Sequence, residues 1–267
     1  MENIETVNQQ QRAHEPAIPP EWTLPSDELT LADDEVHVWR AALDLPEAVV
    51  HDLRRTLDAA EIVRAERFHF HKDRDHFIVA RGLLRTILGR YLKADPCTLG
   101  FRYGTQGKPY LIRPQHQSDE DDALQFNLSH SAGVVLLAVT SNRELGIDLE
   151  RIRPEFASES IAEQYFSPPE IATLRSLPVT VQPAAFFNCW TRKEAYLKAR
   201  ADGLSFPLDQ FDVSLIPGEP PVLFRVRSEP CEIERWSLHQ LNPGSEYAAT
   251  LVIEGHSCRL ETLRWLP

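Results

Sequence analysis

The stretch VVLLAVTSNRELGIDLE, residues 134–150, begins with the longest apolar run of the chain. Six apolar residues in a row are typical of a buried strand, and the alternation at the end of the stretch is typical of a second strand. We interpret residues 141–143 as the turn of an antiparallel hairpin between these strands. In the second strand Asp148 and Glu150 share one face, and we expect Ile147 and Leu149 to point to the core.

Strand and helix patterns alternate on both sides of this stretch. Before it, they predict strands at residues 36–39, 99–103, 107–110 and 124–128, and helices from residue 45, at 59–70 and at 73–92. After it, they predict helices at 159–166, 169–177 and 183–201, the last closed by Asp202-Gly203, and strands at 211–215, 222–226, 236–241 and 247–253. This order predicts an α+β (α/β) fold of two similar halves, 21–144 and 145–267, preceded by a mobile tail at 1–20.

Composition excludes several classes of function. The 267 residues include 28 lysines and arginines against 40 aspartates and glutamates, a net charge of −12. This charge argues against sequence-independent binding to nucleic acid or to an anionic membrane. The apolar runs are too short to span a membrane, the N-terminus has no signal-peptide pattern, and the four cysteines show no metal or disulfide spacing. We therefore expect a soluble, cytoplasmic protein.

Two motifs with acidic residues are candidates for a functional site. Asp148 and Glu150 repel each other on one strand face unless a proton or cation lies between them. Their oxygens suit Mg²⁺ or Mn²⁺, ions that also bind phosphate, although a solvent-facing strand edge would show the same pattern. Trp190, Glu194 and Lys198 share one face of the helix at 183–201. A surface ion pair would explain Glu194 and Lys198, but a tryptophan on the same face indicates that this face is not simply solvated.

The segment 126–131, sequence FNLSHS, carries polar groups suited to phosphate. An apolar strand here runs into what we interpret as a polar turn, where Ser129 and His130 offer hydrogen-bond donors. A serine hydrolase is the rival interpretation. Adjacent Ser129 and His130 do not readily form a nucleophile–base pair, and the chain has no G-x-S-x-G motif.

Further cations gather in two places. The turn Gly107-Lys108-Pro109 presents a lysine, a residue type that binds phosphate as a point charge. The segment 64–85 is rich in arginine and histidine, including Arg64 and Arg81, which suits a polyanionic ligand or simply a partly exposed helix. The acidic stretch 118–122 is better explained as a solvated loop than as a cation site.

Taken in chain order, the segments 107–109, 126–131, 146–150 and 190–198 resemble those of the Sfp-type 4′-phosphopantetheinyl transferases. The resemblance covers residues 59–215 and implies a pseudo-two-fold monomer of two subdomains, with coenzyme A in the cleft between them. It also implies holo-acyl-carrier-protein synthase activity, in which the phosphopantetheine arm of coenzyme A moves to a serine of an apo acyl or peptidyl carrier protein and 3′,5′-ADP is released.

The resemblance also implies roles for single residues. It gives Asp148, Glu150 and Glu194 as ligands of Mg²⁺ or Mn²⁺, with Glu194 also the candidate general base. The residues that it implies for binding coenzyme A are Arg64, Arg81, Lys108, Ser129, His130 and Lys198. Among these, Lys198 would stabilise the pyrophosphate during transfer, so that it acts in catalysis together with Asp148 and Glu194.

Carrier proteins are acidic, so docking needs a local apolar or basic surface on this acidic chain. We predict this surface at residues 161–177 and 184–187 of the second subdomain. Two alternatives stay open: another Mg²⁺-dependent phosphoryl enzyme, such as a nucleotide phosphatase, and a non-enzymatic module that binds coenzyme A or carrier protein. The sequence does not indicate which carrier is used.

Overall fold

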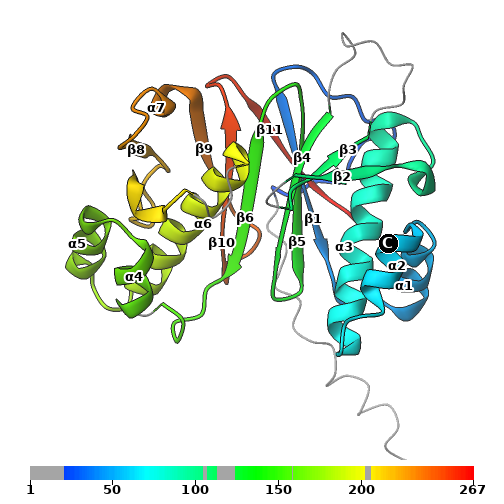
Figure 1. Cartoon of the computed structure of the whole chain (residues 1–267), viewed down its shortest axis with the longest axis horizontal. Helices are drawn as coiled ribbons and strands as arrows, with labels where there is room; N and C mark the ends of the chain where they lie inside the picture. The colour runs from blue at the N-terminus through cyan, green and yellow to red at the C-terminus, as the bar shows by residue number, and fades with distance from the viewer. Residues whose placement is uncertain (1–20, 105–106, 113–123, 158, 202–205) are drawn as a thin grey trace, which may run out of the picture.

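A computed structural model describes residues 21–104, 107–112, 124–157, 159–201 and 206–267. The first half of the fold is a four-stranded sheet with the order β11-β1-β5-β4 (Figure 1). Its strands are β1 (Glu35–Ala42), β4 (Leu124–Ser131), β5 (Val134–Ser141) and β11 (Arg259–Arg264). β11 runs parallel to β1, and the other pairs are antiparallel. Its helices are α1 (Glu47–Arg54), α2 (Ala59–Ala65) and α3 (His71–Leu92), followed by the 3₁₀ helix η1 (Pro96–Thr98) and the hairpin of β2 (Phe101–Tyr103) and β3 (Pro109–Leu111).

The second half is a three-stranded antiparallel sheet with the order β6-β10-β9. Its strands are β6 (Leu145–Arg151), β9 (Trp236–Leu241) and β10 (Tyr247–Glu254). The long helix α6 (Gln182–Arg200) packs on it, with α4 (Glu159–Tyr165) and α5 (Pro168–Ser176) outside. The small elements η3 (Leu208–Gln210), β7 (Phe211–Val213), β8 (Leu223–Val226) and α7 (Glu232–Arg235) complete this half.

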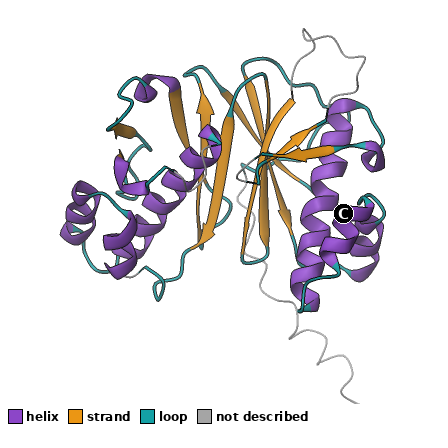
Figure 2. Cartoon of the chain, in the orientation of Figure 1, coloured by secondary structure: helices purple, strands orange, loops and turns teal. Residues whose placement is uncertain are grey.

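The two sheets lie next to each other at the centre of the molecule, with helices on the outside (Figure 2). An apolar cluster fills the space between the sheets, with Val36 and Leu136 from the first and Ile147 and Leu251 from the second. Separate clusters attach α3 to the outer face of the first sheet and α6 to that of the second. The predicted α+β class is confirmed. None of the described helices is both long and apolar enough to cross a membrane.

The predicted hairpin at residues 141–143 is wrong. β5 pairs with β1 and β4, whereas β6 pairs with β10 in the other sheet. β5 is buried along its whole length and apolar from Val134 to Val139, so it occupies the interior of its own sheet between two neighbours. Asn142 in the connection takes a left-handed conformation with a φ of 55°, and the chain leaves one sheet for the other there.

Three side chains of β4 connect the edges of the two sheets. Asn127 Oδ1 accepts a hydrogen bond from the amide of Ile147 at 2.9 Å, and Ser129 Oγ accepts one from the amide of Leu149 at 3.2 Å. One step further, Ser131 Oγ accepts from the next alternate amide of β6, that of residue 151, at 3.1 Å. We call this row of contacts the seam.

The seam explains why the predicted polar turn at residues 129–131 is wrong. These residues continue β4 to Ser131, so every second side chain, at 127, 129 and 131, points to the same side. Short polar side chains there satisfy strand amides that would otherwise be buried without a partner.

Most of the other predicted elements are present with shifted ends. The predicted helix 73–92 is α3, and it ends at Lys93, whose φ of 49° is left-handed. Helix α6 ends at Ala201, with a φ of 58°. The predicted stop at 202–203, the tail 1–20 and the acidic stretch 118–122 lie outside the described residues. We placed residues 145–267 in the second half, but β11 lies in the sheet of the first half, next to β1.

Gly146 is needed where α6 crosses β6. A Cβ atom added at this glycine would lie 2.2 Å from the carbonyl oxygen of Ala195 and 2.3 Å from the amide nitrogen of Ala199. Both atoms belong to helix backbone, which cannot rotate away. The absence of a side chain therefore lets the helix approach the strand closely.

We predict that Gly146→Ala lowers the free energy of unfolding by about 1–3 kcal/mol or more, because the helix must move away from the strand. Gly100→Ala is the matched control, since its Cβ would meet the side chain of Ile112 at 3.3 Å rather than backbone. The control is expected to change stability by no more than about 1 kcal/mol. Urea unfolding of both variants measures the difference, and equal effects would contradict the packing argument.

Candidate active site at the seam

Asp148 lies in β6 directly beside the seam, and its side chain is buried. Its Oδ1 atom accepts a hydrogen bond from Ser129 Oγ at 2.9 Å and contacts the Lys198 ammonium at 2.6 Å. Among the described residues, no hydrogen-bond partner reaches its buried Oδ2 atom. One oxygen of this carboxylate is thus held in place, and the other is left to accept a ligand.

Lys198 brings α6 to the same point. Its ammonium donates to Ser129 Oγ and to the carbonyl oxygen of Ile147, both at 3.1 Å, in addition to Asp148. Ser129 therefore uses its single proton and both lone pairs in one cluster that joins β4, β6 and α6. The predicted residues Ser129, Asp148 and Lys198, which are far apart in the sequence, are brought into direct contact.

Glu150 and Glu194 flank Asp148 from the strand and from the helix. Burial and the charge of Asp148 raise the pKa of Glu150, against a 2.8 Å hydrogen bond that its Oε2 atom accepts from Ser131 Oγ. Burial, Asp148 and Glu150 raise the pKa of Glu194, against the opposing charge of Lys198. Each carboxylate is therefore easier to protonate than an isolated one.

This group of carboxylates fits a divalent cation. Two carboxyl groups with raised pKa values next to an unpartnered buried oxygen create a demand for positive charge, and oxygen ligands suit Mg²⁺. Their ligand atoms do not converge as closely as those of another group among the described residues, Glu35, His37 and Glu261. Asp148 is instead paired with Lys198, so a cation here would compete with that ammonium.

His130 adds a titratable group at the edge of the site. Surrounding protein and the positive charges of His76 and Lys198 lower its pKa. His130 is nevertheless exposed to solvent. His76 belongs to α3 and Lys198 to α6, so these two helices contribute cations near β4. An anionic ligand at this edge would meet basic groups from both halves of the fold.

Lys108 is placed differently from our expectation. Its ammonium donates three hydrogen bonds of 3.1 Å, to Glu144 and to the carbonyl oxygens of Leu145 and Lys198. All three N–H groups are thereby used, and burial lowers the pKa of this lysine. Lys108 connects the start of β6 with the end of α6, and a phosphate could bind it only by displacing these partners.

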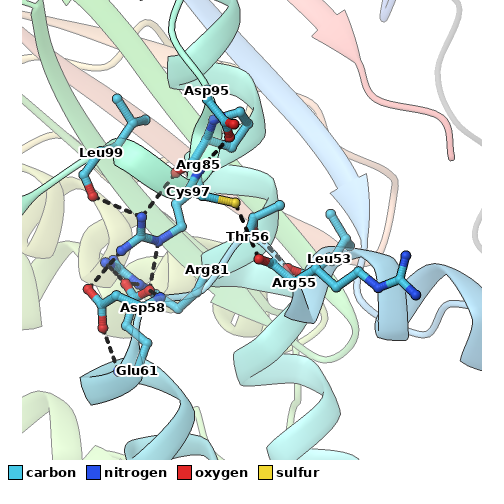
Figure 3. A network of polar contacts seen from close by, with 11 residues as sticks. Leu53, Arg55, Thr56, Asp58, Glu61, Arg81, Arg85, Asp95, Cys97 and Leu99 are labelled. Carbon is cyan, nitrogen blue, oxygen red and sulfur yellow. Dashed lines mark hydrogen bonds and ion pairs between the residues drawn. The ribbon is translucent and has the colours of Figure 1, made fainter.

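Arg81 is also engaged within the protein. Figure 3 shows its guanidinium turned toward Glu61, together with Arg85 and Asp58. Arg81 Nε donates to Glu61 Oε1 at 2.7 Å, and Arg85 Nε donates to Glu61 Oε2 at 2.7 Å. The buried Arg85 side chain also reaches the carbonyl oxygen of Leu99 at 2.8 Å. These ion pairs fix α2 on α3, so Arg81 supports the fold of this region.

Arg64 is exposed on α2. It lines a surface hollow together with Val63, Arg67 and Phe68, and its guanidinium lies over the ring of Phe77, 5.3 Å from the ring centre. In contrast to Arg81, no described ion pair holds it. Of the two arginines that we predicted as ligands of coenzyme A, Arg64 is the accessible one.

The predicted docking surface needs a correction. Phe186 and Phe187 at residues 184–187 are buried in the core of the second half, 3% and 4% exposed, so they cannot offer a surface to a partner. Exposed large apolar side chains on this half include Phe156, just after β6, Val179, just after α5, and Val222 and Phe224 at β8. The guanidinium of Arg153 lies 4.2 Å from the centre of the Phe156 ring.

The structural roles of two residues in the 126–131 segment were missed from the sequence. Asn127 and Ser131 position the backbone of β6, and Ser131 also donates to Glu150. The available signal was the alternation of polar residues at 127, 129 and 131, which indicates one polar face on a strand.

Comparison with known proteins shows which family this chain belongs to. The description "4′-phosphopantetheinyl transferase, N-terminal" matches residues 47–142, and "4′-phosphopantetheinyl transferase superfamily" matches residues 144–252. The 4′-phosphopantetheinyl transferase HetI of Nostoc sp. is 42% identical over 234 residues, which cover 88% of this chain and 94% of that protein. The chain belongs to the 4′-phosphopantetheinyl transferase superfamily.

Further relatives of this phosphopantetheinyl transferase have the same activity in their names. Sfp of Bacillus subtilis is 30% identical over 186 residues, 69% of this chain and 77% of that protein. Among solved structures, a coenzyme A complex of ACPS from Chronobacterium ammoniagenes aligns with a TM-score of 0.32 and 23% identity, over 43% of this chain and 98% of that one. The two matched regions of this transferase meet at residues 142–144, where the chain passes from β5 to β6.

We predict that Glu194→Gln raises the melting temperature of the metal-free transferase, because the amide removes repulsion with Asp148 and Glu150. A gain of about 1 kcal/mol would shift it by about 2–4 °C. Because the pKa of Glu194 is raised in the folded state, its ionisation costs stability as pH rises from the ordinary value of 4.5 toward the raised pKa. Thermal unfolding in EDTA at a series of pH values should show a higher melting temperature for the variant above the raised pKa. The difference should disappear below pH 4.5, where Glu194 is protonated in both the folded and the unfolded state. A lower melting temperature for the variant at neutral pH would contradict the predicted repulsion.

Proposed function

We propose that the protein transfers the phosphopantetheine arm of coenzyme A to a serine hydroxyl of an apo carrier protein, with Mg²⁺ or Mn²⁺ held by Asp148, Glu150 and Glu194. The observation that carries the proposal is the cluster in which Ser129 and Lys198 hold one oxygen of Asp148 while the other stays unpartnered. Family membership gives the class of reaction, and this cluster supplies the groups that the reaction needs.

The transfer is a displacement at phosphorus. The serine oxygen forms a bond to the phosphorus that carries the pantetheine arm, the bond from this phosphorus to the leaving phosphate oxygen breaks, and 3′,5′-ADP departs. The serine proton passes to Glu194, directly or through water. A bound divalent cation supplies neutralisation of the pyrophosphate charge.

The cations of the site divide into two groups in this proposal. Lys198 and His130 lie near the carboxylates and would face the pyrophosphate, while Arg64 would face a more distant phosphate of coenzyme A. Lys108 and Arg81 act as positioning residues, because their donors are bound to Glu144 and Glu61. The Lys198 ammonium also has three partners, but its side chain is 29% exposed against 8% for Lys108, so a pyrophosphate would reach it more readily.

The carrier protein would dock on the segment that follows β6. Arg153 and Phe156 form an exposed basic and apolar pair there, close in sequence to the metal ligand Glu150. A basic patch attracts an acidic partner in spite of the net negative charge of the chain. We also propose that the monomer is the active form, because β4, β6 and α6 of one chain supply the proposed metal ligands and the cations beside them.

Intact-mass spectrometry of an apo acyl carrier protein, incubated with this protein, coenzyme A and Mg²⁺, tests the reaction. We expect the carrier to gain one phosphopantetheine arm, and EDTA to prevent the gain. Glu194→Gln should reduce the transfer rate by at least about 100-fold, because it removes both a base and a metal ligand. Glu246→Gln, an exposed carboxylate that pairs with Arg151, is the matched control and should transfer at the parent rate.

Full activity of Glu194→Gln would contradict the assigned chemistry. No transfer to acyl and peptidyl carriers, with coenzyme A still bound, would favour a binding module. Binding of neither substrate would contradict the assignment as a whole.

For docking, we predict that Arg153→Glu raises the KM for the carrier by about tenfold, because it places a negative charge against an acidic partner. The KM for coenzyme A should not change. Arg55→Glu, an exposed arginine of the first half, serves as the control. Steady-state kinetics with each substrate varied in turn separate the two constants. An equal effect of both variants would show that general charge, rather than this surface, governs carrier binding.

A further inference from the structure

A second group of possible ligands lies on the first sheet, away from the seam. Glu35 and His37 are on β1, and Glu261 is on β11, the strand at the opposite edge of this sheet from β4. In the parallel register of β1 and β11, His37 lies directly opposite Glu261, and Glu35 shares the same face two residues earlier. One ligand atom from each residue lies within 4.8 Å of the other two.

His37 is the decisive member of this group. Its side chain is 4% exposed, and among the described residues no hydrogen-bond partner reaches its buried Nε2 atom. This nitrogen lies 3.5 Å from Glu261 Oε2 and 3.9 Å from Glu35 Oε2. A buried nitrogen that faces two carboxylates without a hydrogen bond is unfavourable unless a cation or a proton joins them.

The other side of the ring is held in place. His37 Nδ1 and the hydroxyl oxygen of Tyr91 share a hydrogen bond of 2.7 Å, and the same oxygen accepts one from Trp39 Nε1 at 2.9 Å. When Nδ1 carries the proton, the lone pair of Nε2 points toward the carboxylates. A hydrogen bond to the second ring nitrogen is the usual way in which proteins orient a metal-binding histidine.

Glu261 gives the group access to solvent, whereas the Glu35 side chain is 7% exposed and its Oε2 atom accepts a hydrogen bond from the amide of Ala32 at 2.7 Å. Glu261 is 43% exposed, and the group opens into a hollow that is also lined by Leu29, Ala32 and Arg259. Arg259 contacts Glu35 Oε1 at 2.5 Å and is itself 60% exposed. A cation at this point would compete with the Arg259 guanidinium, which has room to turn into solvent.

We propose that Glu35, His37 and Glu261 form a binding site for a divalent transition-metal ion of the Zn²⁺ type. One imidazole nitrogen and two carboxylate oxygens are ligands that Zn²⁺ accepts, and the hollow leaves a fourth position for water. Mg²⁺ is disfavoured here, because it prefers oxygen ligands throughout. The ion would tie the C-terminal strand β11 to β1, so its role is structural and does not depend on the transfer reaction.

Calorimetric titration of the full chain with Zn²⁺ tests the site, with excess Mg²⁺ present so that sites made of oxygen ligands are already occupied. We expect His37→Gln and Glu261→Gln each to weaken the tightest Zn²⁺ equivalent by at least about tenfold. Glu246→Gln, a carboxylate of similar exposure in the second half, is the matched control and should titrate like the parent. Identical isotherms for the parent, Glu261→Gln and His37→Gln would overturn the proposal.

Two further measurements separate metal binding from damage to the fold. Zn²⁺ should raise the melting temperature of the parent but not that of Glu261→Gln, whose exposed side chain can be replaced without disturbing the core. Tyr91→Phe keeps all three ligands and removes the hydrogen bond to Nδ1, so we expect about 10–100-fold weaker Zn²⁺ binding from this positioning residue. An equal Zn²⁺ shift in the parent and Glu261→Gln would place the ion elsewhere and contradict the site.

Discussion

At the edge of β6, three side-chain oxygens of β4 accept the hydrogen bonds that the backbone carbonyls of a neighbouring strand would otherwise accept. The candidate active site depends on these contacts. Asn127, Ser129 and Ser131 accept hydrogen bonds from alternate amides of β6, so the two sheets meet without continuing each other's backbone ladder. Because a hydroxyl can donate while it accepts, the two serines also donate to carboxylates of β6. The contacts that close the fold therefore also orient the proposed metal ligands.

The same arrangement concentrates unfavourable charge. Burial and mutual repulsion raise the pKa values of Glu150 and Glu194, and Lys198 offsets only part of this repulsion. The close approach of α6 at Gly146 brings Glu194 and Lys198 over the strand. In the proposed reaction, this negative charge would favour the binding of a divalent cation, and that cation would in turn attract the pyrophosphate.

Local sequence patterns were sufficient for most elements and insufficient for contacts between distant segments. The spacing of α3 and the alternation of β6 were readable, because they depend on periodicity within one element. The hairpin at 141–143 was predicted wrongly, because nothing local shows that the next strand pairs with β10. The sequence did not show that Lys108 and Arg81 are paired within the protein, because their partners, Glu144 and Glu61, lie 36 and 20 residues away. Strand β11 was missed, since its partner β1 lies at the other end of the chain.

A double-mutant cycle on the free energy of unfolding tests the central claim most directly. Ser129→Ala and Asp148→Asn are measured singly and together by urea unfolding in EDTA. If Ser129 joins the two sheets and holds Asp148, the two changes are coupled by about 1 kcal/mol or more. The pair Ser131→Ala and Asp148→Asn is the comparison, because Ser131 donates to Glu150 instead, and its coupling should be smaller. Effects of Ser129→Ala and Asp148→Asn that add to within about 0.3–0.5 kcal/mol would contradict the account.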